Sequence, residues 1–198
     1  TEPFLKKIRA ICDEKNILLI LDEVQCGVGR SGKLFAHEWV EIEPDIMMVA
    51  KGIGGGFPLG AVLAKENAAS GMTAGTHGST YGGNPLGCSI GLKVMDIISD
   101  PNFLYDVNRK AKLFHDGLLE LLRKNTSIFE EVRGKGLMLG LKCKVKNIDV
   151  VNAAYSNKLL TVPAGDNVVR LLPPLTISDK DINEALNKLD GVMTALSQ

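Results

Sequence analysis

Two charged side chains, Asp22 and Lys51, stand directly after apolar runs that are typical of buried strands. The run at 17–21 reads ILLIL and ends in Asp22, and the run at 46–50 reads IMMVA and ends in Lys51. In open α/β sheets, ligands bind at the edge formed by the carboxyl ends of the parallel strands. A lysine held there among apolar groups and glycines loses its proton more easily than an exposed lysine, which suits it to attack an aldehyde and form a Schiff base.

A pyridoxal phosphate site needs such a lysine, together with a carboxylate that keeps the ring nitrogen of the cofactor protonated. Asp22 is a candidate for that carboxylate. Both residues also have ordinary structural explanations, because an aspartate at a strand end often caps a turn and a lysine there is usually solvated. On spacing alone, a cofactor site and a purely structural role both stay open.

Two glycine-rich stretches resemble phosphate-binding loops but lack essential parts of them. The first, CGVGRSGKLF at 26–35, has Leu34 where a P-loop places the Ser or Thr that holds magnesium. It is also separated from the preceding strand by Asp22–Gln25. The second, GIGGGF at 52–57, has Phe57 in place of the third glycine of a dinucleotide fingerprint. We interpret the first stretch as a turn beyond the strand and expect neither to bind a nucleotide.

The first half of the chain is predicted to be an α/β unit that brings the two strand ends together. A helix at 3–14, with its apolar residues on one face, precedes the strand at 17–21. A third apolar run, at 59–64, follows a glycine-rich turn. The pair Asn84-Pro85 is typical of a capped helix start with proline at the first helical position. Because small residues follow, we expect this helix to be closely packed and buried.

The second half is predicted to be a small α/β domain. A break at 100–102 places the domain boundary near Pro101 and divides the chain into 1–100 and 101–198. A long amphipathic helix follows the break, and Ser178 caps a last helix. Between these helices the pattern predicts a strand around 132–143, a helix near 149–158, and strands at 159–162 and 168–172.

The composition is that of a globular protein without a marked net charge. The chain has 198 residues, 45% of them hydrophobic, and 23 basic against 23 acidic residues, so we expect neither nucleic acid nor a membrane as a partner. Its four cysteines form no metal-ligand spacing with the three histidines, which favours a reduced, cytoplasmic setting and no metal site. The chain begins without methionine and already inside a helical pattern, so we expect a missing amino-terminal part.

Three segments, in this order and separation, resemble the class III aminotransferases, which use pyridoxal phosphate on the fold type I architecture. They are LLILDEVQCGVGRSGKLFAHE, PDIMMVAKGIGGGFPLGAVLA and THGSTYGGNPLG. Two further segments, EVRGKGLMLGL and VPAGDNVVRLLPPLTIS, are similar to the family's small domain. The resemblance implies that residues 1–100 are the carboxyl-terminal portion of a cofactor-binding large domain with a mostly parallel sheet, and that 101–198 are the small carboxyl-terminal α/β domain.

The resemblance also implies roles for individual residues. Lys51 would be the lysine that holds the cofactor and acts as general base, and Asp22 the partner of the ring nitrogen. Gln25 would lie by the phenolic oxygen of the cofactor. In the family, the threonine of the HGST segment reaches the cofactor phosphate of the neighbouring subunit, which points to Thr80, with Ser79 beside it. The active unit would then be a homodimer.

Arg170 resembles the family arginine that contacts a substrate carboxylate or pairs with a glutamate; the alternative is a strand arginine that packs its stem at the domain surface. The small domain is most similar to enzymes that transfer the terminal amino group of N-acetylornithine, or a similar ω-amino donor, to 2-oxoglutarate, giving glutamate, in arginine biosynthesis. Several family site residues precede the strand ending in Asp22 and are not found here. The alternative function is therefore a non-catalytic remnant that serves as a binding or scaffolding subunit.

Overall fold

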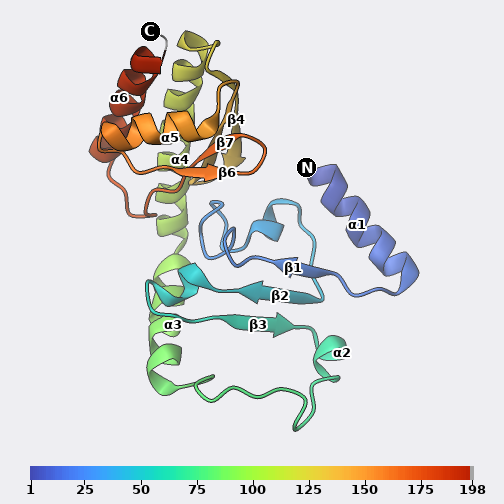
Figure 1. The fold of residues 1–198 in the computed structure, drawn as a ribbon. Coiled ribbons are helices and arrows are strands. Elements are labelled where there is room, and N and C mark those ends of the chain that lie inside the picture. Colours follow the sequence, from blue (N-terminus) through green and yellow to red (C-terminus); the bar gives the residue numbers. More distant parts are fainter. Residues whose placement is uncertain (197–198) are drawn as a thin grey trace. The chain divides into compact units, whose positions relative to one another are not determined.

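The computed structural model describes residues 1–196, which form two compact units (Figure 1). The first unit spans Thr1–Leu104 and the second begins at Tyr105. The division falls within helix α4 (Pro101–Lys124).

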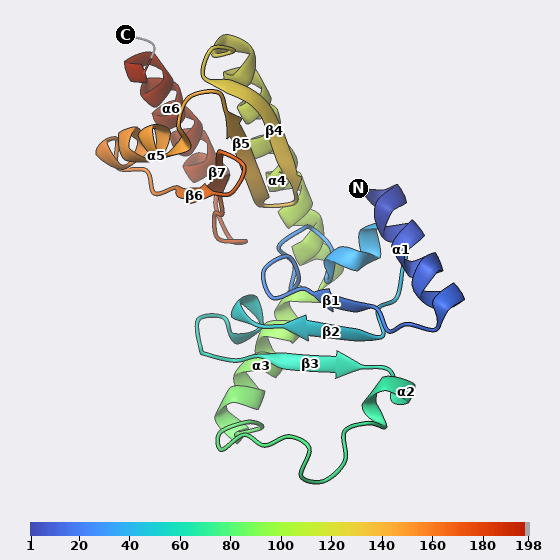
Figure 2. The ribbon, with the colours of Figure 1, turned by 45° about the vertical axis from the view of Figure 1, so that its right-hand side comes forward.

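The first unit is built on a three-stranded sheet with β2 in the middle. The strands are β1 (Ile20–Asp22), β2 (Ile46–Val49) and β3 (Ala61–Ala64). β1 runs parallel to β2, and β3 runs antiparallel to it, as the arrows in Figure 2 show. The strands expected at 46–50 and 59–64 are thus confirmed, whereas the run at 17–21 is a strand only at its carboxyl end.

Helix α1 (Glu2–Lys15) confirms the helix expected at 3–14 and packs against the sheet with part of its apolar face. Three of its apolar residues lie against a small core that contains Leu19 and Ile42: Leu5, Ile8 and Cys12. The two others expected on this face, Phe4 and Ile11, are 59% and 43% exposed. The buried stripe of this helix is therefore narrower than the pattern predicts.

One face of the sheet is open within the first unit, Thr1–Leu104. Side chains on neighbouring strands share a face when they stand in register, and successive residues alternate between faces. Asp22 is in register with Met48, and Met48 with Val62, so these three lie on one face. Val62 is 65% exposed, and Ile20, on the same face as Asp22, is 51% exposed. The expectation that the run at 17–21 is buried throughout is wrong, because no element of the first unit covers this face.

Three short helices follow the strands of the first unit: η1 (Ala36–Trp39), η2 (Lys51–Gly54) and α2 (Glu66–Ala69). The longer helix α3 (Pro85–Ile98) comes after an exposed loop. The predicted cap of α3 is confirmed, since the Gly87 N–H donates to Asn84 Oδ1 at 2.8 Å. The prediction that α3 is buried is wrong: it packs through Gly87 and Gly91, whereas Leu86 and Leu92 are 62% and 66% exposed.

The second unit packs helices against an antiparallel sheet with the strand order β4-β5-β7-β6. After α4, its elements are β4 (Phe129–Lys135), β5 (Met138–Cys143), α5 (Asn147–Ser156), β6 (Val162–Ala164), β7 (Val168–Leu171) and α6 (Asp179–Leu196). The single strand expected around 132–143 is in fact the hairpin of β4 and β5. The chain reverses at Gly136, which has a φ of 58°.

Each of the two long helices of this unit buries apolar residues along one face. The buried residues of α4 are Val107, Ala111, Phe114, Leu118 and Leu121, and those of α6 are Ile182, Leu189, Val192 and Met193. The cap of α6 is also confirmed, since the Asp181 N–H donates to Ser178 Oγ at 3.1 Å. Within the described residues, none of the helices has the length and apolar character needed to cross a membrane.

Candidate active site

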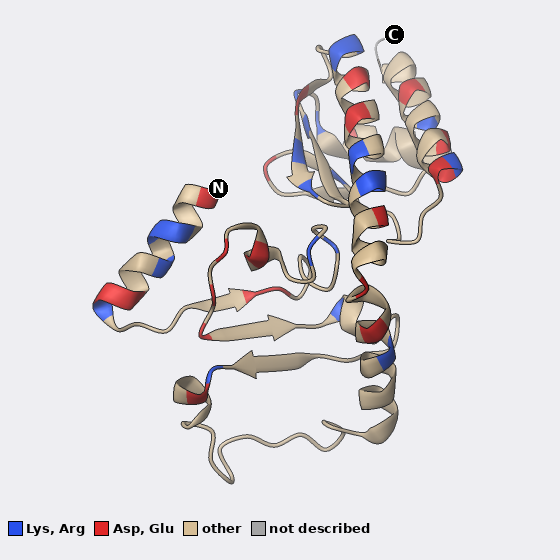
Figure 3. Ribbon diagram, turned by 180° about the vertical axis from the view of Figure 1, so that it is seen from behind, with Lys and Arg blue, Asp and Glu red and all other residues tan. Residues whose placement is uncertain are grey.

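Asp22 and Lys51 lie at the same edge of the sheet of the first unit. β1 and β2 are parallel, so their carboxyl ends meet, and the ladder continues past Asp22 through a bond from the Glu23 N–H to the Met48 carbonyl at 2.9 Å. Lys51 follows β2 as the first residue of η2. In Figure 3, β2 and β3 carry no charged residues, red marks the end of β1, and blue marks the start of η2. This edge thus brings the carboxylate side chain of Asp22 and the side chain of Lys51 beside an apolar sheet surface.

The turn after β1 orients Asp22 and carries Gln25. The Val24 N–H donates to Asp22 Oδ1 at 2.9 Å, which fixes one carboxylate oxygen on its own turn. Gln25 is half-buried in the same turn. Cys26 follows, with Sγ 3.6 Å from the Asp22 carbonyl. Burial raises the pKa of the Cys26 thiol, and the nearby carboxylates of Glu23 and Asp22 raise it further, so the thiol is kept neutral beside the candidate site.

Glu23 is a residue of this site that sequence reasoning missed. Asp22 is exposed, whereas the side chain of the next residue, Glu23, is buried and only 2% exposed. Its two carboxylate oxygens accept the Ala36 N–H at 2.6 Å and the His37 N–H at 2.8 Å, and Oε1 lies 2.9 Å from His37 Nδ1. A buried carboxylate is stable only with such partners. Glu23 therefore ties the turn to η1; the only sequence signal for it was an acidic residue between two site residues.

Lys51 lies at a sharp change of backbone direction. Its φ is 48°, in the left-handed region that residues other than glycine rarely adopt. The side chain is exposed, on the same edge as Asp22. The short helix η2 continues from it through bonds from Ile53 N–H to the Ala50 carbonyl at 3.3 Å and from Gly55 N–H to the Gly52 carbonyl at 3.0 Å. The glycines of GIGGGF thus form the turn that carries Lys51.

Ser79 and Thr80 lie in the exposed loop before α3, away from secondary structure. Ser79 Oγ accepts the Gly82 N–H at 2.9 Å, and the following Tyr81 is 81% exposed. Ser79 and Thr80 are both exposed, although the Ser79 hydroxyl is bound to the backbone of its own loop. That this loop serves the site of a neighbouring subunit stays a prediction.

Arg170 lies in the second unit, in the middle of β7. It stands in register with Gly140 on β5 and with Val162 on β6, and it is half-buried. There is no room for a side chain at Gly140, the residue in register with Arg170, because a methyl group there would lie 2.7 Å from Val168 Cγ1. Its predicted contact with a substrate carboxylate stays a prediction, and so does the alternative of a strand arginine at the domain surface.

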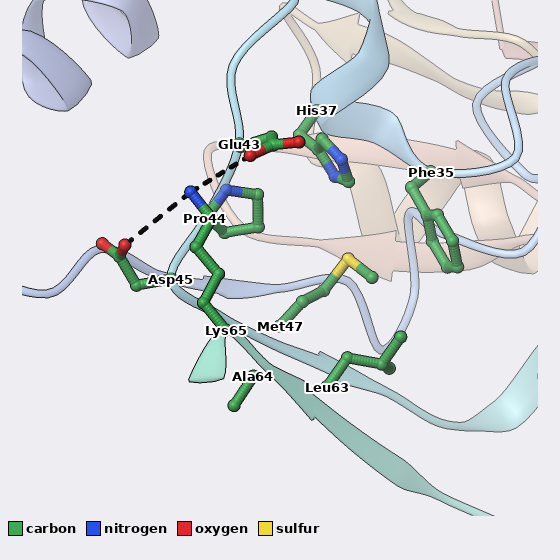
Figure 4. Close-up of a pocket in the computed structure, with 9 residues that line it drawn as sticks. All are labelled: Phe35, His37, Glu43, Pro44, Asp45, Met47, Leu63, Ala64 and Lys65. Atoms are coloured by element: carbon green, nitrogen blue, oxygen red, sulfur yellow. Dashed lines mark ion pairs between the residues drawn. The ribbon is translucent and has the colours of Figure 1, made fainter. Parts of the chain in front are cut away.

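One pocket of the first unit lies on the opposite face of the sheet from Asp22. It has a volume of about 340 Å³ and is lined by Met47 and Leu63, which alternate with the residues of the Asp22 face. Figure 4 shows Lys65 at one side of it, paired with Glu43 at 3.1 Å and Asp45 at 3.9 Å. None of the predicted site residues lines this pocket. Within residues 1–196, no group of three or more His, Cys, Asp or Glu residues is placed to hold a metal ion.

The sequence is similar to class III aminotransferases over nearly its whole length. A family model described as "Aminotransferase class-III" matches residues 1–193. The chain is 63% identical to the acetylornithine aminotransferase of Rhodobacter capsulatus over 98% of this chain and 50% of that protein. It is 57% identical to the acetylornithine aminotransferase of Mesorhizobium japonicum over 93% of this chain and 46% of that protein. The chain thus spans about half the length of the curated relatives it matches.

Solved structures agree with this relationship. The N-acetylornithine aminotransferase of Stenotrophomonas maltophilia superposes with a TM-score of 0.87 at 36% identity, over 98% of this chain and 51% of that one. The ornithine aminotransferase of Plasmodium yoelii superposes with a TM-score of 0.91 at 31% identity, over 98% of this chain and 52% of that one. The fold is therefore α/β, a partial fold type I arrangement with a small second α/β unit, and the chain belongs to the class III aminotransferase family.

Proposed function

We propose that this chain supplies the covalent lysine and the ring-nitrogen carboxylate of a pyridoxal phosphate-dependent aminotransferase. The reaction is transfer of the terminal amino group of N-acetylornithine, or a similar ω-amino donor, to 2-oxoglutarate, as in arginine biosynthesis. The observation that carries this proposal is the placement of Asp22 and Lys51 at one edge of the parallel pair β1 and β2. The printed names of the relatives from Rhodobacter and Mesorhizobium support the choice of donor.

The residues at this edge fit the cofactor chemically. When bound, pyridoxal phosphate would supply an aldehyde for covalent attachment and a ring that accepts electrons. Lys51 Nζ would bind the cofactor and, once displaced, move the proton from the reacting carbon of the substrate. The Asp22 carboxylate would hold a proton on the ring nitrogen, and the Gln25 amide would bind the phenolic oxygen. The exposed apolar face beside Asp22, which includes Ile20 and Val62, suits a flat aromatic ring.

Two further contributions would complete the site. Thr80, with Ser79, would bind the cofactor phosphate of a second subunit, so that a homodimer is the active unit. Arg170 would bind a carboxylate of the amino donor or of 2-oxoglutarate through its planar guanidinium group. The exposure of the loop before α3 supports the first contribution. The four free cysteines support a reducing, cytoplasmic setting.

Covalent trapping of the cofactor tests the central assignment. The chain is incubated with pyridoxal phosphate and reduced with borohydride, and the modified peptide is located by mass spectrometry. We expect a pyridoxyl adduct at Lys51 that Lys51→Ala removes. Lys33→Ala is the matched control, because Lys33 stacks on Trp39, with Nζ 5.3 Å from the ring centroid, and should leave the adduct intact. Equal labelling of several lysines, without preference for Lys51, would refute the assignment.

Turnover is tested in a chimera in which this chain is joined to the half of the Rhodobacter capsulatus protein that it does not match. With acetylornithine and 2-oxoglutarate, the chimera should form glutamate, and Lys51→Ala should reduce kcat on the order of 10³-fold or more. The alternative, a non-catalytic subunit, predicts neither an adduct in the chain nor turnover in the chimera. An adduct in the chain with turnover confined to the chimera supports the proposed function.

A further inference from the structure

Two residues near the candidate site, Val28 and Lys51, have strained backbones. Val28 has a φ of 54° and Lys51 a φ of 48°. A β-branched residue in the left-handed region is a clear outlier, because its Cβ branches crowd the backbone. Such conformations persist only where the surrounding structure holds them, and they cluster at functional sites. Val28 therefore needs contacts that keep it in this conformation.

Backbone hydrogen bonds on both sides fix Val28 in this conformation. The Gly27 N–H donates to the Glu23 carbonyl at 3.0 Å, and the Gly29 N–H donates to the Leu34 carbonyl at 3.1 Å. Gly27 also packs tightly on Glu23, since a methyl group at Gly27 would lie 2.9 Å from Glu23 Oε2. Glu23 itself is anchored to η1 through its buried carboxylate. The turn from Glu23 to Val28 is thus a rigid support.

The side chain of Val28 rests on the backbone beside Lys51. Val28 is 3% exposed. A methyl group placed on Gly52 would lie 3.3 Å from Val28 Cβ and 3.6 Å from Val28 Cγ1, so the two residues are already in close contact. Gly52 follows Lys51 directly in η2. The isopropyl group of Val28 therefore limits how the backbone at Lys51 can move.

We propose that Val28 is a positioning residue for Lys51: the anchored turn from Glu23 presses its side chain against Gly52 and holds Lys51 in the left-handed conformation. The inference rests on the proposed role of Lys51 in binding the cofactor. In this arrangement one turn orients both Asp22 and Lys51, because its Val24 N–H binds Asp22 Oδ1 at its start and Val28 contacts Gly52 at its end. A lysine with a fixed backbone loses less conformational freedom when its Nζ binds an aldehyde.

The test compares Val28→Ala with Val40→Ala. Both changes remove the same two methyl groups from a buried valine of the first unit, since Val40 is 5% exposed, but Val40 packs against Leu19 and Ile42. Two readouts separate positioning from stability: the backbone ¹³C chemical shifts of Lys51 in the cofactor-free chain, which report its φ, and the fraction of Lys51 trapped by borohydride at limiting pyridoxal phosphate. The Tm of each variant measures the loss of stability.

We expect both variants to lower Tm, but only Val28→Ala to shift the Lys51 signals away from the left-handed pattern and to weaken cofactor capture about tenfold. Val28→Thr, which keeps the branched shape, should preserve the Lys51 shifts. Unchanged Lys51 shifts in Val28→Ala, or equal changes in Val40→Ala, would overturn the proposal. If neither the parent chain nor the chimera forms an adduct at Lys51, the proposed function fails, whereas the chemical shifts still decide whether Val28 positions Lys51.

Discussion

At the scale of single residues, Asp45 is a buried charge that links three segments of the first unit. It is 8% exposed and stands directly before β2. Its Oδ2 accepts the Leu19 N–H at 2.7 Å and the Arg9 Nη1–H at 2.7 Å. Asp45 thus joins α1, the approach to β1 and the start of β2. The hydrogen bond from Leu19 and the Arg9 guanidinium hold the pKa of Asp45 below its usual value.

Asp45→Asn should therefore lower the free energy of unfolding near neutral pH by about 1 to 3 kcal/mol, because the amide keeps an acceptor but leaves Arg9 without this charged partner. The folded-state pKa of Asp45 lies below the unfolded value of about 3.9, so its stabilising effect is complete above that pH and is lost as the pH falls through the folded-state pKa. Urea unfolding of both proteins along a pH series measures the difference, which should be constant near neutrality and shrink in acid.

The control for this prediction is Asp116→Asn. Asp116 pairs with Lys112 one helical turn away on the surface, with its side chain 52% exposed, and solvent screens the pair. Its loss should have a much smaller effect on unfolding than that of Asp45. If the two variants lose equal stability, or if the Asp45 difference persists unchanged in acid, the role assigned to Asp45 is wrong.

At the scale of elements, the start of α3 links the exposed loop of Ser79 and Thr80 to the rest of the first unit. Asn84 Oδ1 accepts the Gly87 N–H at 2.8 Å, and Asn84 Nδ2 donates to the Tyr81 carbonyl at 2.9 Å. One side chain therefore caps the helix and holds the end of the loop. The cap was predictable because Asn before Pro is a local signal; its second bond was not, because it depends on the path of the loop.

Asn84→Ala should destabilise the first turn of α3 by about 1 kcal/mol and loosen the loop before it. Asn84→Asp keeps the capping oxygen and should retain the helix start, although it loses the donor to Tyr81. Amide hydrogen exchange at Gly87 and Cys88 measures the cap in the three proteins. Equal exchange in Asn84→Ala and the parent would show that the cap does not hold this turn.

The elements that the sequence predicts well are those whose signals are local. The buried stripes of α4 and α6 follow a regular spacing, and caps such as Ser178 show themselves in the residue type. The hairpin of β4 and β5 was missed although the sequence holds a local signal for its turn, since two glycines, Gly134 and Gly136, stand between the strand-like residues on either side. The apolar run at 17–21 predicted burial on both faces, but burial depends on which elements cover a sheet, and no local pattern contains that information.

The same distinction applies to the candidate site. Asp22 and Lys51 could be chosen from their positions after two apolar runs, and the parallel pairing of β1 and β2 brings those strand ends to one edge. Glu23 and Val28 could not be chosen. Glu23 contacts a segment that is 13 residues away, at Ala36, and Val28 contacts Gly52 across the sheet edge. Their roles come from tertiary contacts, for which one sequence gives no signal.

At the scale of the whole molecule, the two units differ in how completely their apolar side chains are buried. The side chains that are completely buried gather in the second unit, among them Leu118, Leu141, Val169 and Leu189. The first unit instead exposes much of its sheet, with Val62 65% and Leu63 44% exposed. In the described residues, the outer edges of β1 and β3 also have no strand beside them.

Amide hydrogen exchange should therefore be slower in the sheet of the second unit than at the edges of the sheet of the first unit. The amides of β5 and β7, which lie inside the sheet of the second unit, should open with a free energy about 2 kcal/mol or more above those of β1 and β3. The internal control is β2, which pairs on both sides and should exchange more slowly than its two neighbours in the same sheet. Measurement on the cofactor-free chain by mass spectrometry or NMR tests both comparisons. Equal protection of β1, β2 and β3 would mean that the open edges of the first unit are covered in solution, for instance by a second copy of the chain, and the dependence of protection on protein concentration would then identify such an association.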